Sequence, residues 1–208
     1  MTFRETRWWW VRHAPVIQTE NRIYGQTDLP CDCSDEALFR GIAQALPAPA
    51  VLVTSDLQRA TQTAAAIVAA GLALPDGIPD SAFREQHFGD WQGEMRKEFF
   101  ARRGGHVPGT WIAPPEERAP NGESFADLVE RVIPAVERYT LDHGGKDIIC
   151  VAHGGTIKAA LGHALGLDFK QSLAFSLANC SVTRIDHLRP EDGPEAWRVS
   201  MVNWLPPR

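Results

Sequence analysis

Two short apolar runs, far apart in the chain and each followed by a histidine, constrain the fold most strongly. The first run is Trp8–Val11, followed by Arg12 and His13. The second run is Ile148–Ala152, followed by His153. Such short apolar runs are typical of strands that are buried on both faces of a sheet. Because open α/β sheets bind ligands at the carboxyl ends of their strands, we expect both histidines at one such edge.

Strand-like and helix-like segments alternate along the chain. Residues 51–54 and 147–152 are predicted strands, and Ser55 with Gln58 matches a capping box that starts a helix near Asp56. The predicted helices cover residues 35–46, 56–70, 124–141 and, after a turn at Gly154 and Gly155, 156–165. The alternation favours an α/β fold with a mostly parallel central sheet and helices on both faces.

Residues 82–121 interrupt this alternation. The segment is rich in Gly, Pro, Arg and Trp, so we predict a small irregular lid over the site, with Trp91 packed in the core and Trp111 near a ligand. The tail segments 182–185 and 197–204 are predicted to add edge strands. A length of 208 residues is that of one domain, so we expect residues 1–208 to form a single domain that includes the lid.

Charge and hydropathy bear on partners and location. The net charge of −5 gives no sign of a nucleic-acid partner. The apolar runs are too short to cross a bilayer, and no signal-peptide pattern follows the N-terminus. We therefore expect a cytoplasmic protein with no membrane partner, whose four cysteines are unpaired. The oligomeric state stays open.

Several motifs of phosphate chemistry are missing from the sequence. No cysteine is followed by arginine six positions later, and Asp-x-Asp, Walker A, Gly-x-Gly-x-x-Gly and His-Glu-x-x-His patterns are all absent. If phosphate chemistry takes place here, histidine must perform most of it, without a metal.

Arginine and histidine side chains at the predicted sheet edge suit a phosphoryl group. The imidazole of His13 is a competent nucleophile near neutral pH. The guanidinium of Arg12 offers a planar set of donors, and Arg59, in the first turn of the predicted second helix, faces the same edge.

Three further positions extend this site. His153 can donate to a phosphoryl oxygen, and the glycines after it let backbone N–H groups approach a phosphate closely. Glu85 lies beside aromatic residues, where a carboxyl group can stay protonated near neutral pH and serve as a general acid. Taken singly, each residue has an ordinary structural explanation, such as a core histidine, an exposed arginine or a loop carboxylate.

Four segments in order resemble the histidine phosphatase superfamily, in its phosphoglycerate-mutase-like branch. They are residues 11–14, 54–64, 85–93 and 151–155, and Gly122–Ser124 with Arg131 also fits a helix start of that family. The resemblance covers nearly the whole chain. It departs from the family at Ala14, where glycine is usual.

The resemblance implies a role for each candidate residue. His13 would attack phosphorus and become phosphohistidine, while Arg12, Arg59 and His153 would hold the phosphoryl oxygens. Glu85 would protonate the leaving oxygen and then help to activate water. Gly154 and Gly25 are the further substrate-binding candidates, and the resemblance implies no metal and no cofactor.

Three functions remain open from the sequence. The leading one is a phosphomonoesterase for a small phosphorylated metabolite; chain length and the Gly122–Ser124 helix start resemble those of α-ribazole phosphatases, which suggests α-ribazole 5′-phosphate. The second is a cofactor-dependent phosphoglycerate mutase, although the segment between Glu85 and His153 is short for one, with basic residues at 96, 97, 102 and 103. The third is a non-catalytic phosphate-binding module.

Overall fold

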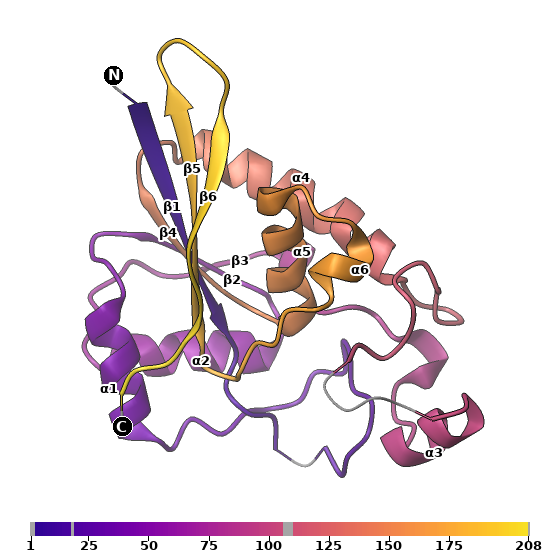
Figure 1. The fold of residues 1–208 in the computed structure, drawn as a ribbon. Coiled ribbons are helices and arrows are strands. Elements are labelled where there is room, and N and C mark those ends of the chain that lie inside the picture. Colours follow the sequence, from indigo (N-terminus) through magenta and orange to yellow (C-terminus); the bar gives the residue numbers. More distant parts are fainter. Residues whose placement is uncertain (1–2, 18, 106–109, 208) are drawn as a thin grey trace.

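A six-stranded sheet with strand order β3-β2-β4-β1-β5-β6 forms the centre of the protein. The computed structural model describes residues 3–17, 19–105 and 110–207 (Figure 1). The strands are β1 (Phe3–Arg12), β2 (Val51–Thr54), β3 (Ile78–Pro79), β4 (Asp147–Ala152), β5 (Val182–Pro190) and β6 (Ala196–Trp204). The neighbouring strands from β3 to β1 are parallel, and β5 and β6 are added antiparallel. The predicted α/β class with a mostly parallel sheet is confirmed.

Helices cover both faces of this sheet, as predicted (Figure 1). The helices are α1 (Glu36–Ala45), α2 (Gln58–Ala69), α3 (Arg96–Arg102), α4 (Phe125–Asp142), α5 (Gly154–Leu165) and α6 (Phe169–Ser172). The α1–α2 pair packs against one face, and α4 with α5 packs against the other. The helices predicted at 35–46 and 124–141 and the strand predicted at 147–152 are confirmed.

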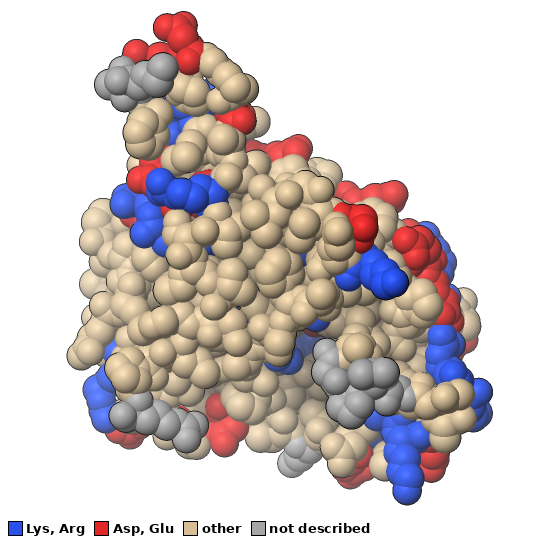
Figure 2. Space-filling view, in the orientation of Figure 1, with Lys and Arg blue, Asp and Glu red and all other residues tan. Residues whose placement is uncertain are grey.

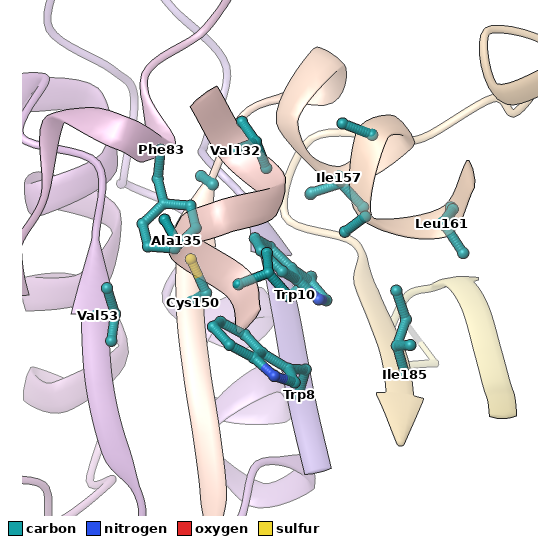
Figure 3. Close-up of a cluster of buried hydrophobic side chains, with 14 of the residues drawn as sticks. Trp8, Trp10, Val53, Phe83, Val132, Ala135, Cys150, Ile157, Leu161 and Ile185 are labelled. Atoms are coloured by element: carbon teal, nitrogen blue, oxygen red, sulfur yellow. The ribbon is translucent and has the colours of Figure 1, made fainter. Parts of the chain in front are cut away.

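Tryptophans of β1 fill the core between the sheet and α4 and α5 (Figure 3). Trp8 and Trp10 point to the same side because side chains alternate along a strand, and their rings stack at a centroid distance of 4.9 Å. Both are fully buried, and Phe83 packs edge-on against each of them. Trp9 faces the other side, where its Nε1 donates to Asp147 at 2.8 Å. Packing on both sides explains the continuous apolar run.

Two helix starts differ from the prediction. The capping box at Ser55 is wrong: α2 begins at Gln58, whose backbone N–H donates to Asp28 Oδ1 at 2.8 Å from a distant loop. The Ser55 hydroxyl instead accepts from the Leu57 N–H at 3.3 Å. The predicted turn at Gly154 and Gly155 is also wrong, because these glycines are the first two residues of α5.

The C-terminal segment and the lid hold more structure than predicted. Strand β5 lies between β1 and β6, so β5 is not an edge strand. Residues 82–121 contain a 3-10 turn at Gly89–Trp91 and helix α3, and together with Ile23 they form a small apolar cluster. The lid is therefore less irregular than predicted, because its aromatic residues pack together; residues 106–109 lie outside the described ones.

The four cysteines are free, as predicted. No described helix is both long and apolar enough to cross a membrane.

Candidate active site

The two histidines lie side by side at the carboxyl edge of the sheet. His13 directly follows β1 and His153 directly follows β4, and these two strands are parallel neighbours. The His13 backbone N–H continues the ladder by donating to Ala152 O at 2.9 Å. The imidazole centroids are 5.0 Å apart. The structure thus brings together the two residues that the sequence placed at one edge.

The hydrogen bonds of His13 define its tautomer. His13 is 1% exposed, and its Nδ1 lies 2.7 Å from the Ala14 carbonyl oxygen. A carbonyl oxygen only accepts, so Nδ1 carries the proton and the Nε2 lone pair remains available. Neighbouring contacts hold the backbone here: Ala14 N–H donates to Thr63 Oγ1, and Asn179 Nδ2 donates to His13 O, both at 2.8 Å.

The hydrogen bond to His153 gives that ring the opposite role. Arg59 Nε donates to His153 Nδ1 at 3.2 Å, so Nδ1 accepts and the proton resides on Nε2. His153 Nε2 is buried and has no hydrogen-bond partner among the described residues. A buried donor without an acceptor is costly, and such positions usually mark a ligand or a functional role. His153 thus offers a hydrogen-bond donor beside the lone pair of His13.

Burial and positive neighbours hold both imidazoles in the neutral form. Burial, followed by the charges of Arg59 and Arg12, lowers the pKa of His13 well below 6.5. The pKa of His153 is lowered well below 6.5 by burial and then by Arg59. Neutral imidazole is the nucleophilic form, so the local field suits attack by His13.

A cavity of about 280 Å³ opens beside this buried pair. Of the predicted site residues, Arg12, Gly25, Glu85 and Gly154 line the cavity, whereas His13, Arg59 and His153 are buried next to it. Figure 2 shows a hollow on the face of the molecule, below the position of α5 in Figure 1, with Lys and Arg atoms inside it.

One end of the Arg12 guanidinium is anchored, and its Nε–H donor is available. Its Nη1 donates to Leu177 O at 2.5 Å, and its Nε is buried without a partner among the described residues. A Cβ at Gly154 would lie 3.7 Å from that Nε and 3.8 Å from Glu85 Oε2. The unpaired Arg12 donor and the Glu85 carboxylate therefore meet at the first residue of α5.

The Arg59 guanidinium is held by three hydrogen bonds within the protein. Besides His153, it donates through Nη1 to Thr27 O at 2.8 Å and through Nη2 to Gly25 O at 2.5 Å. Gly25 has a φ of +45°, and a side chain there would overlap Gln86 O and the ring of Phe88. Gly25 thus lets this turn close tightly against the lid while its carbonyl orients Arg59.

The carboxylate of Glu85 sits at the N-terminus of α5. The Gly155 N–H donates to Glu85 Oε1 at 3.1 Å and Oε2 at 3.2 Å, and the Gln86 N–H donates to Oε1 at 2.9 Å. Arg131, on α4, holds the loop behind Glu85 by donating to Glu85 O at 2.9 Å and to Arg84 O at 3.0 Å. Glu85 is 9% exposed and lines the cavity.

Sequence reasoning missed Lys158, a lining residue with distinctive chemistry. Lys158 is on α5, four positions after Gly154, and is 6% exposed. That spacing alone would have placed it on the same helix face as Gly154. Trp111 also lines the cavity, as expected, while Trp91 packs in the lid cluster. No group of metal-ligating side chains occurs among the described residues.

The four basic residues at positions 96, 97, 102 and 103 differ in position. Arg96 lines the cavity. Arg102 pairs with Glu94 and Arg103 pairs with Glu117, and Lys97 is exposed. Only one of the four basic residues therefore faces the site within the part of the chain that the structure describes.

Solved structures share this fold. The native structure of a mycobacterial glucosyl-3-phosphoglycerate phosphatase superposes with a TM-score of 0.77 at 26% identity, covering 97% of this chain and 99% of its own. A putative α-ribazole-5′-phosphate phosphatase from Escherichia coli has a TM-score of 0.76 at 19% identity, with 96% of each chain covered, and is alike in fold.

Curated relatives match at the sequence level. A 2,3-bisphosphoglycerate-dependent phosphoglycerate mutase 2 of Gloeobacter violaceus is 32% identical over 85% of this chain and 84% of its own. A glucosyl-3-phosphoglycerate phosphatase of Mycolicibacterium vanbaalenii is 32% identical over 93% of this chain and 92% of its own. The family model of the histidine phosphatase superfamily (branch 1) matches residues 8–203. The chain therefore belongs to the histidine phosphatase superfamily, branch 1, and is an enzyme of that family.

Proposed function

We propose that this enzyme is a metal-independent phosphomonoesterase that hydrolyses a small phosphorylated metabolite through a phosphohistidine at His13. The observation that carries the proposal is the pair of complementary imidazoles. His13 presents a lone pair at Nε2, and His153 presents a buried Nε2–H without a partner among the described residues. A nucleophile next to unpaired donors suits an electrophile that bears anionic oxygens.

The first half of the reaction transfers the phosphoryl group to the enzyme. His13 Nε2 attacks phosphorus, so that a P–N bond forms while the P–O ester bond breaks. His153 Nε2–H and Arg12 Nε donate to the phosphoryl oxygens and stabilise their charge in the transition state. Arg59 orients His153 and adds positive charge. In this step Glu85 carries a proton in the enzyme–substrate complex and gives it to the leaving oxygen, which departs as an alcohol.

The second half returns the enzyme to its starting state. Glu85, now a carboxylate, accepts a proton from water as the water oxygen attacks phosphorus. The P–N bond breaks, inorganic phosphate forms, and His13 recovers its lone pair. The N–H of Gly155 keeps the Glu85 carboxylate beside Gly154, where both steps need it.

Hydrolysis of p-nitrophenyl phosphate in the presence of EDTA tests this proposal. We expect turnover by the unaltered enzyme, none above background by His13→Ala, and an acid-labile phosphoenzyme in the unaltered enzyme alone. Absence of EDTA-resistant turnover in the unaltered enzyme contradicts the proposal. A panel of small phosphate esters that includes α-ribazole 5′-phosphate then ranks substrates; a cavity of about 280 Å³ favours small ones.

A phosphoglycerate mutase is the second candidate, favoured by the match to the Gloeobacter mutase. A mutase has to bind a bisphosphate, and one lid arginine, Arg96, is available at the cavity for a second phosphate. Interconversion of 3-phosphoglycerate and 2-phosphoglycerate that is stimulated by 2,3-bisphosphoglycerate would favour the mutase. We expect no such stimulation and net release of inorganic phosphate instead.

A further inference from the structure

Lys158 is a buried cation that the phosphoryl-transfer steps do not use. It lines the cavity with only 6% of its surface exposed, and its Nζ donates to Leu173 O at 2.9 Å. The same nitrogen lies over the Trp111 ring, 4.7 Å from the ring centroid. Among the described residues no carboxylate forms an ion pair with Lys158. A buried lysine is usually paired, so this amine is suited to a negative partner from outside the protein.

The position of Lys158 relative to the phosphoryl site follows from helix geometry. Gly154, at the start of α5, lies next to Arg12 Nε and Glu85 Oε2. Lys158 follows four residues later on the same helix face, about 6 Å along the helix axis. Lys158 lines the same cavity as Gly154 and Glu85, whereas His13 and His153 are buried next to it, so the amine faces the space that remains for the leaving group of a phosphate ester.

The amine of Lys158 has N–H donors that remain available for a ligand. An ammonium group has three N–H donors, and Leu173 O accepts one of them. Trp111 covers the amine from one side, and its own Nε1 is held by Gln86 Oε1 at 2.9 Å. Burial lowers the pKa of Lys158 to about 8, while the charge of Glu85 opposes the shift. The amine is thus mostly protonated at neutral pH.

We infer that Lys158 is a specificity-determining residue that binds a carboxylate on the leaving group of the substrate, so that the substrates are phosphate esters of small hydroxy acids. One ammonium group balances one negative charge, which suits a carboxylate better than a second phosphate with nearly two charges. The inference rests on the proposed phosphomonoesterase function and adds the substrate class to it. Esters of neutral alcohols leave this buried ammonium group without a negatively charged partner.

A matched pair of substrates tests the inference. 3-Phosphoglycerate and glycerol 3-phosphate share a three-carbon skeleton and differ in that a carboxylate replaces a CH₂OH group. Values of kcat/KM are measured for both esters with the unaltered enzyme, Lys158→Met, Lys158→Arg and the control Lys146→Met, which makes the same change at an exposed lysine. The ratio of the two kcat/KM values does not depend on how much of a variant is folded.

The unaltered enzyme is expected to prefer 3-phosphoglycerate. Lys158→Met should lower the ratio about 10- to 100-fold, the size expected for one hydrogen bond between charged groups. The loss should lie mainly in KM for 3-phosphoglycerate, because the carboxylate is remote from the reacting bond. Lys158→Arg should restore part of the ratio, and Lys146→Met should leave it unchanged.

Other outcomes separate this inference from the proposed function. Equal loss on both esters in Lys158→Met would show that Lys158 only supports Trp111 and Leu173 and would overturn the inference. An unchanged ratio, or an unaltered enzyme that prefers glycerol 3-phosphate or α-ribazole 5′-phosphate, overturns it as well. Failure of the unaltered enzyme to hydrolyse any of these esters or p-nitrophenyl phosphate contradicts the proposed function itself.

Discussion

The backbone N–H of Gly155 donates to both carboxylate oxygens of Glu85, which come from a loop 70 positions earlier in the chain. A side chain at position 155 would overlap Glu85 Oε1 and come within 3.2 Å of Trp111 and Leu128. Glycine at this position therefore lets the helix N-terminus, with its partial positive charge, receive the carboxylate.

Replacing Gly155 with alanine is expected to displace Glu85. We expect kcat for an alkyl phosphate ester to fall about 10- to 100-fold, because a misplaced acid no longer protonates the leaving oxygen. The loss should be smaller for p-nitrophenyl phosphate, whose leaving group needs little protonation. Gly154→Ala is the comparison variant, because its Cβ would make ordinary contacts with Arg12 Nε at 3.7 Å and Glu85 Oε2 at 3.8 Å. Its kcat should therefore fall less than that of Gly155→Ala. Equal losses on both ester types would argue against the acid role.

Arg131→Met and Arg138→Met make the same change on one helix and should differ strongly in effect. Arg131 donates to carbonyl oxygens of the Glu85 loop and pairs with Glu123 at 2.8 Å. Its loss leaves Glu123 unpaired and should lower the free energy of unfolding by about 2–4 kcal/mol, with a clear fall in kcat. Arg138, 56% exposed, pairs with Asp80, and its loss should cost less than about 1 kcal/mol. Urea unfolding measures the loss of unfolding free energy in both variants. Similar losses would contradict the larger contribution expected of Arg131.

The stacked tryptophans of β1 allow a second matched comparison. Trp8 Nε1 donates to Thr140 Oγ1 at 2.9 Å, whereas Trp10 Nε1 is buried without a partner among the described residues. Both substitutions to phenylalanine remove the same volume from one core. Trp8→Phe should therefore destabilise the protein by about 1 kcal/mol more than Trp10→Phe, because only Trp8→Phe breaks a hydrogen bond. Chemical denaturation of the two variants checks the order, and equal losses would show that the Thr140 contact contributes nothing.

The two buried imidazoles should make stability depend on pH below 6.5. The pKa of His13 and that of His153 are both lowered in the folded protein, chiefly by burial. As the pH falls through 6.5, the unfolded chain takes up protons at these rings while the folded chain does not. The free energy of unfolding should therefore fall as the pH is lowered from 7 towards 5.

A double variant isolates this contribution. His13→Gln with His153→Gln removes both titrating rings, so its unfolding free energy should change less over the same pH range than that of the unaltered protein. Urea unfolding at pH 7, 6 and 5 gives the comparison. Identical pH dependence in the two proteins would show that the imidazoles titrate alike in the folded and unfolded states.

Selectivity for a carboxylate should weaken at alkaline pH. The pKa of Lys158 is lowered to about 8 by burial, with Glu85 opposing and Arg12 adding to the shift. Above that pH the amine of the free enzyme loses its charge, so the kcat/KM ratio for 3-phosphoglycerate over glycerol 3-phosphate should decline between pH 7 and 9.5. The ratio for Lys158→Arg should stay level over this range, because guanidinium does not titrate there. A level ratio in the unaltered enzyme would contradict this expectation.

Local patterns predicted those elements whose boundaries depend on nearby residues. The apolar run 147–152 is strand β4, and Asp35 caps α1 through the Leu38 N–H as a local signal should. Ser124 likewise forms a capping box with Asp127 at the start of α4. By contrast, α2 is capped by Asp28, 30 positions away, and no local pattern contains such a partner. The sequence pattern at Ser55 consequently predicted the wrong cap.

In the candidate site, too, some features follow from local sequence and others from contacts between segments that are distant in the chain. The sequence by itself determined that two histidines end buried strands and that the residues of one family's motifs occur in order, because strand patterns and motifs are local. Only the tertiary structure decided which imidazole nitrogen carries the proton, since Ala14 O and Arg59 Nε set that choice through contacts in space. It also decided that Gly155 receives Glu85 and that Lys158 shares their cavity, because helix α5 meets a loop far away in sequence.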